Sequence, residues 1–358
     1  MKNIKKLLSG LLIVGMSTMV AAGCAATEEE TPAPDGNEAP AEEPAEEPEE
    51  TDEDYKLVLR LSHVFSPDEQ LTKSMDLVAE RILEKTDGAI EIQTFPQAQL
   101  AVYKDGLEQV VRGSEFISVE DPSYLGDYVP DFKALVGPML YSEFDQYTQM
   151  IETDLVQDMI AKAEEAGIKI LALDYIFGFR NIITNKLIVN PEDLQGMKLR
   201  TPGSQLFIDS INAMGATATP LPWAETLSAV QQGVVDGLEG SEFTNIGTKV
   251  YEVATNVALT KHFLGTAGVY LSTDVWADIP EEYQTIIEEE FRYGAEEMIQ
   301  IISESYDATK AELEELGVEF NEVNLEAFTE LTKPVYENME GVTPGIYDLL
   351  MDELEKMK

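Results

Sequence analysis

The sequence predicts an α/β protein, and three observations about its residue patterns support that class. Residues 56–62 alternate apolar and polar side chains, as a half-buried strand does. Residues 71–82 instead repeat apolar side chains every three or four positions, as one face of a helix does. The two patterns alternate along the chain, which favours mostly parallel sheets covered by helices. With 358 residues, 44% of them hydrophobic, the chain is long enough to bury a substantial core.

The expected elements follow one another from residue 56. The first helix should begin at Ser66, because serine caps helices, Pro67 suits the first helical position and Glu69 completes a capping box. The other expected strands cover residues 89–95, 116–119, 168–173, 180–184, 197–201, 253–260 and 268–272. The other expected helices cover residues 105–112, 155–165, 204–214 and 223–232, a short turn from residue 190, and a long stretch over 280–316.

Charge and composition exclude several classes of function. The chain has 68 acidic and 24 basic residues and a formal net charge of −44, which argues against nucleic-acid binding and against attachment to anionic lipid through basic residues. It has one cysteine and two histidines, so an intrachain disulfide is impossible and His- or Cys-based metal or triad chemistry is hard to build. We therefore expect no cofactor and no metal site.

Common catalytic motifs are also missing from the sequence. It contains no GxxxxGK[ST], GxSxG, HExxH or CxxC motif. Acidic residues are so abundant that a chosen pair of carboxylates is uninformative about glycoside hydrolysis. We therefore expect that the protein is not an enzyme.

Residues 1–23 are typical of a lipoprotein signal peptide. A start with three lysines precedes an apolar run over 7–20, which is shorter than the roughly 20 residues of a transmembrane helix. Small residues then lead to Cys24, and this order resembles a bacterial lipobox, although Ala21 stands where leucine is preferred. We expect Cys24 to become the lipidated N-terminus and to hold the protein on the outer side of the bacterial cell membrane. An ordinary cleaved signal with an incidental cysteine is the alternative.

The segment 24–54 is expected to be a tether between the lipid and a folded body. Residues 25–54 contain fourteen acidic residues, no basic residue and no large apolar side chain. Such a composition cannot bury enough surface to offset the entropy of ordering. Like charges and prolines favour an extended chain, which reaches about 90 Å if it is fully polyproline-like.

Two arginines and one tryptophan are candidates for a binding cleft. Arg200 lies at the carboxyl end of an expected strand, where ligands bind in open α/β sheets, and Pro202 and Gly203 then turn the chain. Its planar guanidinium matches a carboxylate through two hydrogen bonds. Arg180 follows Gly178 and Phe179 and begins an expected extended stretch, and Trp223 follows the run at 220–222. An ion-paired surface arginine, or a tryptophan packed in the core, is the alternative interpretation.

An ordered series of segments resembles the solute-binding proteins of TRAP transporters, the DctP type. The series includes GFRN at 178–181, PEDLQGMKLRTP at 191–202, PLPWAE at 220–225 and AVQQGVVDG at 229–237. The resemblance extends over about residues 55–340.

The resemblance implies a two-lobed α/β fold, like that of periplasmic binding proteins, which closes on an organic anion between its lobes. Lobe 1 would comprise residues 55–177 and 266–305, and lobe 2 residues 178–265 and 306–358, with the long helix spanning both. The protein would deliver its ligand to the membrane subunits of a transporter driven by an ion gradient.

The resemblance also implies roles for individual residues. Arg200 would clamp the ligand carboxylate, Arg180 would be a second contact and Trp223 would line the cleft. Gly240 replaces an asparagine found in many relatives, which suggests a bulkier or different ligand and favours a sugar acid over a C4-dicarboxylate. The first lobe would contribute Glu120, Tyr103, Ser62 and His63.

Alternatives from other classes stay open at this point. A receptor lipoprotein could report ligand occupancy to a sensor kinase, and a lipid-anchored extracellular glycosidase is less favoured. Among ligands, C4-dicarboxylates, sugar acids, keto acids and amino acids all remain possible.

Overall fold

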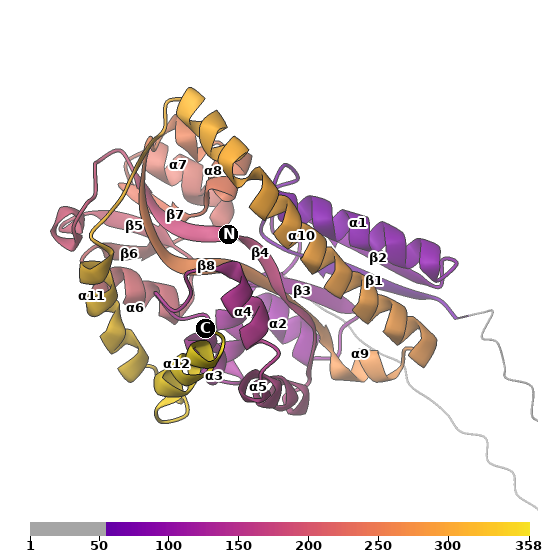
Figure 1. The fold of residues 1–358 in the computed structure, drawn as a ribbon. Coiled ribbons are helices and arrows are strands. Elements are labelled where there is room, and N and C mark those ends of the chain that lie inside the picture. The colour runs from indigo at the N-terminus through magenta and orange to yellow at the C-terminus, as the bar shows by residue number, and fades with distance from the viewer. Residues whose placement is uncertain (1–54) are drawn as a thin grey trace, which may run out of the picture. The chain divides into compact units, whose positions relative to one another are not determined.

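The described part of the chain, residues 55–358 of a computed structural model, contains one mixed sheet (Figure 1). The strand order is β2-β1-β3-β8-β4-β7-β5-β6, with β9 paired to β8. The expected signal peptide at 1–23, the candidate lipidation residue Cys24 and the acidic segment 24–54 lie outside the described residues. The strands are β1 (Leu57–Ser62), β2 (Ile90–Phe95), β3 (Phe116–Glu120), β4 (Ile168–Thr184), β5 (Lys198–Thr201), β6 (Thr217–Pro220), β7 (Gly237–Gly240), β8 (Asn256–Ser272) and β9 (Glu319–Asn321).

Two long antiparallel strands join two parallel blocks of this sheet. In one block β1 lies parallel between β2 and β3, and in the other β5 lies parallel between β6 and β7. The 17-residue strands β4 and β8 pair antiparallel with each other, and they also pair antiparallel with β7 and β3 respectively. The expected α/β class is confirmed, but the sheet is more strongly mixed than the sequence pattern indicated.

Each of these long strands was expected as two shorter ones. The stretches 168–173 and 180–184 belong to β4, and 253–260 and 268–272 belong largely to β8. Both strands are buried on both faces over most of their length, so the apolar–polar alternation that marks a half-buried strand is lost. Register shifts along the β4–β8 pair interrupt the pattern further.

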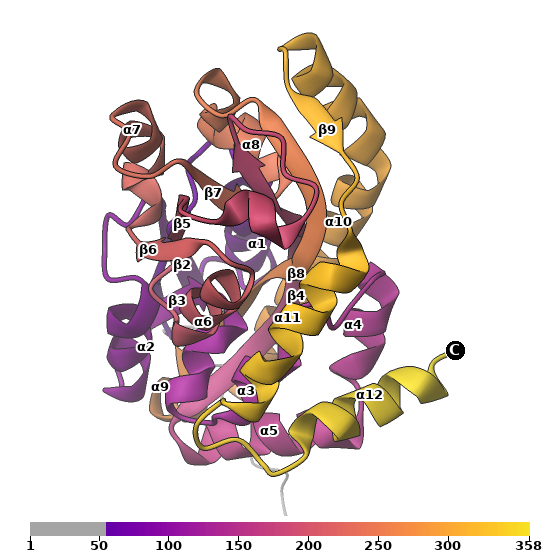
Figure 2. The ribbon, with the colours of Figure 1, turned by 90° about the vertical axis from the view of Figure 1, so that its left-hand side faces the viewer.

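Helices pack around the sheet and connect its strands (Figure 2). The segment 223–232 is not one helix, because a 3₁₀ turn at Trp223–Glu225 precedes α7. The expected short turn after Asn190 is confirmed as Pro191–Leu194. The helices are α1 (Gln70–Lys85), α2 (Tyr103–Val111), α3 (Asp131–Leu135), α4 (Phe144–Met150), α5 (Asp154–Glu165), α6 (Gln205–Ala213), α7 (Thr226–Gln231), α8 (Glu242–Thr248), α9 (Thr273–Ala277), α10 (Glu281–Glu315), α11 (Leu325–Glu337) and α12 (Ile346–Lys356).

The first helix begins later than its capping pattern predicted. Residues 66–69 form a turn, in which the Glu69 carboxylate accepts a hydrogen bond from the backbone N–H of Ser66 at 2.7 Å. Glu69 itself is the residue that precedes helix α1. The reciprocal contact of a capping box is therefore present, but it closes a turn before the helix and leaves Glu69 buried beside other elements.

The long helix expected over 280–316 is confirmed as α10, which crosses the sheet and packs against α1, α8 and β4 (Figure 1). Its inner face approaches β4 closely at Gly294. A side-chain carbon at that position would lie 2.4 Å from Val78 and 2.7 Å from the Tyr175 hydroxyl. That hydroxyl donates a hydrogen bond to the backbone carbonyl of Phe291 at 2.7 Å. Only glycine allows this approach.

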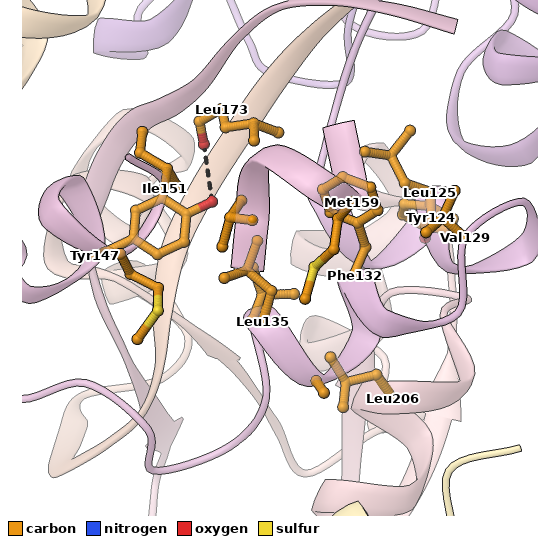
Figure 3. Packing of buried hydrophobic residues seen from close by; sticks show 14 of the residues in the cluster. Tyr124, Leu125, Val129, Phe132, Leu135, Tyr147, Ile151, Met159, Leu173 and Leu206 are labelled. Atoms are coloured by element: carbon orange, nitrogen blue, oxygen red, sulfur yellow. Dashed lines mark hydrogen bonds between the residues drawn. The ribbon is translucent and has the colours of Figure 1, made fainter. Parts of the chain in front are cut away.

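A buried hydrophobic cluster ties helices α3, α4 and α5 to the sheet and to α6 (Figure 3). Tyr147 is fully buried and donates a hydrogen bond to the backbone carbonyl of Leu173 in β4 at 3.1 Å. Phe132, Leu135 and Leu206 belong to the same cluster. Helix α12 packs against α3 and α4, so the C-terminal helix is anchored on the same body of side chains. Within residues 55–358, no helix is both long enough and apolar enough to cross a membrane.

Candidate functional site

A cavity of about 50 Å³ lies beside the carboxyl ends of β3, β5 and β7. This is the edge at which open α/β sheets bind ligands. We call it the inner cavity. Its walls also include residues from the middle of β4 and β8 and from the start of α2. The lining residues are Val64, Phe65, Tyr103, Glu120, Asp121, Tyr124, Phe177, Arg180, Arg200, Pro202, Trp223, Gly240, Thr244 and Thr266.

The structure brings together six of the eight sequence candidates for ligand binding, namely Arg200, Arg180, Trp223, Glu120, Tyr103 and Gly240. Ser62 and His63 are fully buried at the end of β1 and are not part of the lining. Burial lowers the pKa of His63 to about 4, so its ring is neutral near pH 7.

Arg180 is neutralised by a carboxylate of the same protein. Its Nε and Nη2 atoms each donate to one oxygen of Glu239 at 2.5 Å, and Glu239 is 0% exposed. Burial disfavours the charge of Glu239, but the guanidinium beside it keeps the pKa of Glu239 below its usual range. The pairing follows from the sheet, because Ile182 of β4 lies opposite Glu239 in the antiparallel ladder. Arg180 reaches the inner cavity with its charge already balanced.

Arg200 is buried without such a partner. It is 2% exposed, its Nε donates to the backbone carbonyl of Leu221 at 2.9 Å, and its guanidinium lies 5.0 Å from the centre of the Trp223 ring. No carboxylate among residues 55–358 forms an ion pair with it. Burial lowers the pKa of Arg200, although guanidinium remains charged near neutrality. An unpaired buried charge is costly, so an anion in this cavity would compensate it.

Two acidic side chains at the end of β3, Glu120 and Asp121, also line the inner cavity. Glu120 is 3% exposed and accepts a hydrogen bond from the backbone N–H of Tyr103. Burial raises the pKa of Glu120 to about 8 and also raises the pKa of Asp121. At pH 7 Glu120 is therefore mostly protonated and can donate a hydrogen bond. No group of three or more potential metal-ligating side chains occurs within residues 55–358.

Two hydroxyls in the lining are free to recognise a polar ligand. The Tyr124 hydroxyl and Thr266 Oγ1 are buried and have no hydrogen-bond partner in the described structure. Sequence analysis missed both of them, together with Asp121 and Thr244. Only Asp121 carries a signal, since it follows Glu120 directly at a strand end. The others enter the cavity through long-range pairing that residue patterns do not reveal.

Trp223 links the two sides of the inner cavity. Its backbone N–H donates to the Tyr103 hydroxyl at 3.1 Å, and its indole Nε1 donates to Glu69 at 3.3 Å. Burial raises the pKa of that Glu69 carboxyl to about 7. Trp223 thus contacts Arg200 with its ring and bonds to the starts of α1 and α2 through its indole nitrogen and its backbone N–H, respectively.

Comparison with known proteins assigns the fold to one family. The model of the bacterial extracellular solute-binding proteins, family 7 (DctP), matches residues 61–341, which is most of the chain. A TRAP periplasmic solute-binding protein from Desulfovibrio salexigens, solved with diglycerolphosphate, is 65% identical, with a TM-score of 0.84 over 85% of this chain and 98% of that one.

Two further solved TRAP periplasmic solute-binding proteins are similar. One from Fusobacterium, with sn-glycerol-3-phosphate bound, is 44% identical, with a TM-score of 0.83 over 84% of this chain and 98% of that one. One from Actinobacillus succinogenes, with L-galactonate bound, is 29% identical, with a TM-score of 0.80 over 84% of this chain and 99% of that one. The expected two-lobed α/β fold is confirmed by these matches. The chain therefore belongs to family 7 of the bacterial extracellular solute-binding proteins, which serve TRAP transporters outside the cytoplasm and bind solutes rather than convert them.

Proposed function

We propose that this protein captures a small polyhydroxylated organic anion with a single negative charge and delivers it to TRAP membrane subunits. One observation carries the proposal: Arg200 is a buried cation on the cavity wall that has no carboxylate partner among residues 55–358. A carboxylate or phosphate group on the guanidinium would supply the missing charge through directional, charge-assisted hydrogen bonds.

The charge balance of the inner cavity favours one negative charge over two. Arg180 is already paired with Glu239, and Glu120 is mostly protonated at pH 7. Arg200 is therefore the cation in the cavity wall that has no carboxylate partner among residues 55–358. A C4-dicarboxylate would bring a second negative charge with no cation to receive it. A sugar acid and a phosphodiester each carry one.

Two ligand chemistries satisfy this balance. The sequence favours a sugar acid, and the Actinobacillus relative holds L-galactonate. The two more similar solved proteins hold glycerol phosphates. Diglycerolphosphate is a phosphodiester with one negative charge, whereas sn-glycerol 3-phosphate is a phosphomonoester with nearly two near pH 7. A phosphodiester of glycerol is therefore the second candidate, and the 65% identity of the diglycerolphosphate-bound relative favours it for this chain.

Gly240 supports a ligand rich in hydroxyls. A side-chain carbon there would lie 3.1 Å from Thr244 Oγ1. Glycine leaves Thr244 accessible from the cavity, which both residues line. The Thr266 and Tyr124 hydroxyls, which have no hydrogen-bond partner in the described structure, would bond to ligand hydroxyls, whereas Thr244 Oγ1 is already bonded to the backbone of Ser241.

Closure around the ligand would occur between two lobes, lobe 1 at 55–177 and 266–305 and lobe 2 at 178–265 and 306–358. Gly178 adopts a φ of +99°, and the register of the β4–β8 pair shifts beside it, so the proposed hinge coincides with irregular backbone. Small-angle scattering should show a smaller radius of gyration with bound ligand. An unchanged radius with saturating ligand would contradict closure at this hinge.

The attachment to the membrane is proposed from the sequence alone. We propose that residues 1–23 are removed, that Cys24 carries lipid, and that 24–54 tether the body to the cell membrane.

A receptor that reports ligand occupancy to a sensor kinase would use the same cavity. Growth on the ligand after deletion of the TRAP membrane subunits separates transport from this sensing role.

A thermal-shift and calorimetric screen tests the ligand class. The panel comprises succinate, L-galactonate, sn-glycerol 3-phosphate and bis(glycerol) phosphate. We expect a singly charged polyhydroxylated anion to stabilise the protein most, by about 2.7 kcal/mol at a free concentration 100 times its Kd. The ligand should be recovered unchanged. Tightest binding of succinate, or no binding by the whole panel, would contradict the proposal.

A further inference from the structure

A second cavity lies directly beside the inner one. It has a volume of about 280 Å³, and we call it the outer cavity. Both cavities are lined by Tyr103 and Tyr124, whose ring centres are 5.5 Å apart. The two rings therefore belong to the walls of both cavities. The remaining walls of the outer cavity come from Val102, Lys104 and Asp105 at the start of α2, from Gly203 and from residues 220–222, which include Leu221.

Arg200 lies at the junction of the two cavities. It lines the inner cavity, while its Nε is bonded to the carbonyl of Leu221, which lines the outer one. The residues that follow Arg200 also contribute to both cavities, since Pro202 lines the inner cavity and Gly203 lines the outer one. An anion on the guanidinium would therefore have space on both sides.

Tyr103 is held in place at a conformational cost. Its φ is +57°, in the left-handed region that bulky residues rarely adopt. Its backbone N–H is bonded to the buried Glu120, and its hydroxyl accepts a hydrogen bond from the backbone of Trp223. Backbone strain of this kind tends to occur at ligand clamps and switch regions.

The inner cavity is too small to hold a whole polyol anion. One water needs about 10–15 Å³ of such volume, so 50 Å³ corresponds to only a few water molecules. The outer cavity has several times that volume. A ligand bound to Arg200 and larger than the inner cavity would therefore have to extend beyond Tyr103 into the outer cavity.

We propose that the two cavities are subsites of one site, which selects a phosphodiester with a small polyol on each side of the phosphate. The proposal rests on the proposed function and extends it. The phosphodiester group carries one negative charge and matches Arg200, one polyol arm occupies the inner cavity, and the other occupies the outer cavity beyond Tyr103. A phosphomonoester or a sugar acid has a chain on one side only and leaves one subsite empty.

Filling the outer cavity from Gly203 tests this arrangement. No atom lies within 4 Å of a side-chain carbon built there, and its backbone is not in the left-handed region, so larger residues fit the fold. Gly203→Trp fills the outer cavity, while Gly203→Ala is the size control. Calorimetry with each variant uses bis(glycerol) phosphate as the two-armed probe, and sn-glycerol 3-phosphate and L-galactonate as one-armed probes.

We expect the wild type to bind the two-armed probe at least tenfold more tightly than either one-armed probe. Gly203→Trp should remove this preference by weakening the two-armed probe tenfold or more, whereas Gly203→Ala should retain the preference. Thermal unfolding of each free variant checks that the fold is intact.

The outcomes separate this inference from the proposed function. Equal binding of one-armed and two-armed probes by the wild type, or an equal effect of Gly203→Trp on all probes, would overturn the two-subsite arrangement and leave the anion site standing. Failure of all three probes to bind the wild type would overturn both.

Discussion

The two arginines of the inner cavity differ in charge compensation, and a single carboxylate, that of Glu239, causes the difference. Glu239 lies opposite β4 and takes both hydrogen bonds of Arg180, whereas the guanidinium of Arg200 has a backbone carbonyl and a tryptophan ring as its neighbours. Residue patterns alone do not reveal which of the two arginines is paired, since each lies at one end of an expected strand. Their different charge balance depends on the pairing of β4 with β7, which brings together residues 59 positions apart.

Removing the Glu239 charge tests this balance. Glu239→Gln leaves Arg180 as an unpaired buried cation, so the free energy of unfolding should fall by about 3 kcal/mol, as measured by urea denaturation. Succinate should then bind more tightly than to the wild type, because a second cation faces the cavity. The control Glu108→Gln breaks an exposed pair with Arg112 and should cost less than about 1 kcal/mol. Equal losses in the two variants would contradict the role assigned to Glu239.

Glu120 makes stability and binding depend on pH. Its carboxyl ionises near 4.5 in an unfolded chain but keeps its proton to about 8 in the folded protein. Between these values the folded state binds more protons, so this residue lowers stability as pH rises from about 4.5 to 8. Glu120→Gln should flatten the decline in the free energy of unfolding over this window.

The same substitution affects ligand binding. Above about pH 8 an ionised Glu120 repels an anion in the cavity, so wild-type affinity should fall there while Glu120→Gln retains its affinity. Calorimetry from pH 6 to 9 measures the difference, and Glu115→Gln, at an exposed position before β3, is the control. A parallel decline in wild type and Glu120→Gln would contradict this assignment.

At the scale of elements, helices were predicted better than long strands. Helix α10 was found within a residue at each end, because a proline begins it and helical periodicity persists through it. Strands β4 and β8 were each divided in two, because burial on both faces erases the alternation that marks a strand. The candidate site was likewise predicted in part. Local patterns identified strand-end residues such as Arg200. They did not identify Tyr124, Thr266 or the outer cavity, because these depend on long-range packing.

The close approach of α10 to helix α1 and strand β4 at Gly294 gives a prediction at this scale. Gly294→Ala would place a carbon 2.4 Å from Val78, so overpacking should outweigh the gain in helix propensity of roughly 1 kcal/mol. The free energy of unfolding should fall by about 1–3 kcal/mol in urea denaturation. The control Glu304→Ala changes an exposed residue of the same helix. A Gly294→Ala variant as stable as the wild type would show that the helix shifts at little cost.

At the scale of the whole molecule, one mixed sheet extends through both proposed lobes and contains the proposed hinge. The two parallel blocks carry the two sides of the cavity, and β4, β8 and α10 connect the blocks. Trp223 bonds across the cavity to Tyr103 and Glu69, so the contacts that bring the sides together surround the proposed anion anchor. Binding of the ligand and closure of the lobes would therefore favour each other.

The expected attachment to the membrane is tested with the full chain. Cys24→Ser should remove the protein from the membrane fraction of the producing bacterium or leave it unprocessed, because the single cysteine is the proposed lipid acceptor. The control Thr31→Ser keeps the cysteine and should fractionate with membranes. Normal cleavage of Cys24→Ser with full retention on membranes would contradict lipid anchoring.

The central claim is that Arg200 holds the ligand anion, and calorimetry on Arg200→Ala and Arg200→Lys tests it most directly. Removing one partner of a buried charge pair costs about 2–5 kcal/mol, so Arg200→Ala should bind the best ligand of the panel at least about 30-fold more weakly. Arg200→Lys should also lose much of the affinity, because an ammonium keeps the charge but not the planar fork. Arg112→Lys, on the surface, is the control. Binding by Arg200→Ala within about threefold of wild type, a change of about 0.7 kcal/mol, would contradict the account and place the anchor elsewhere.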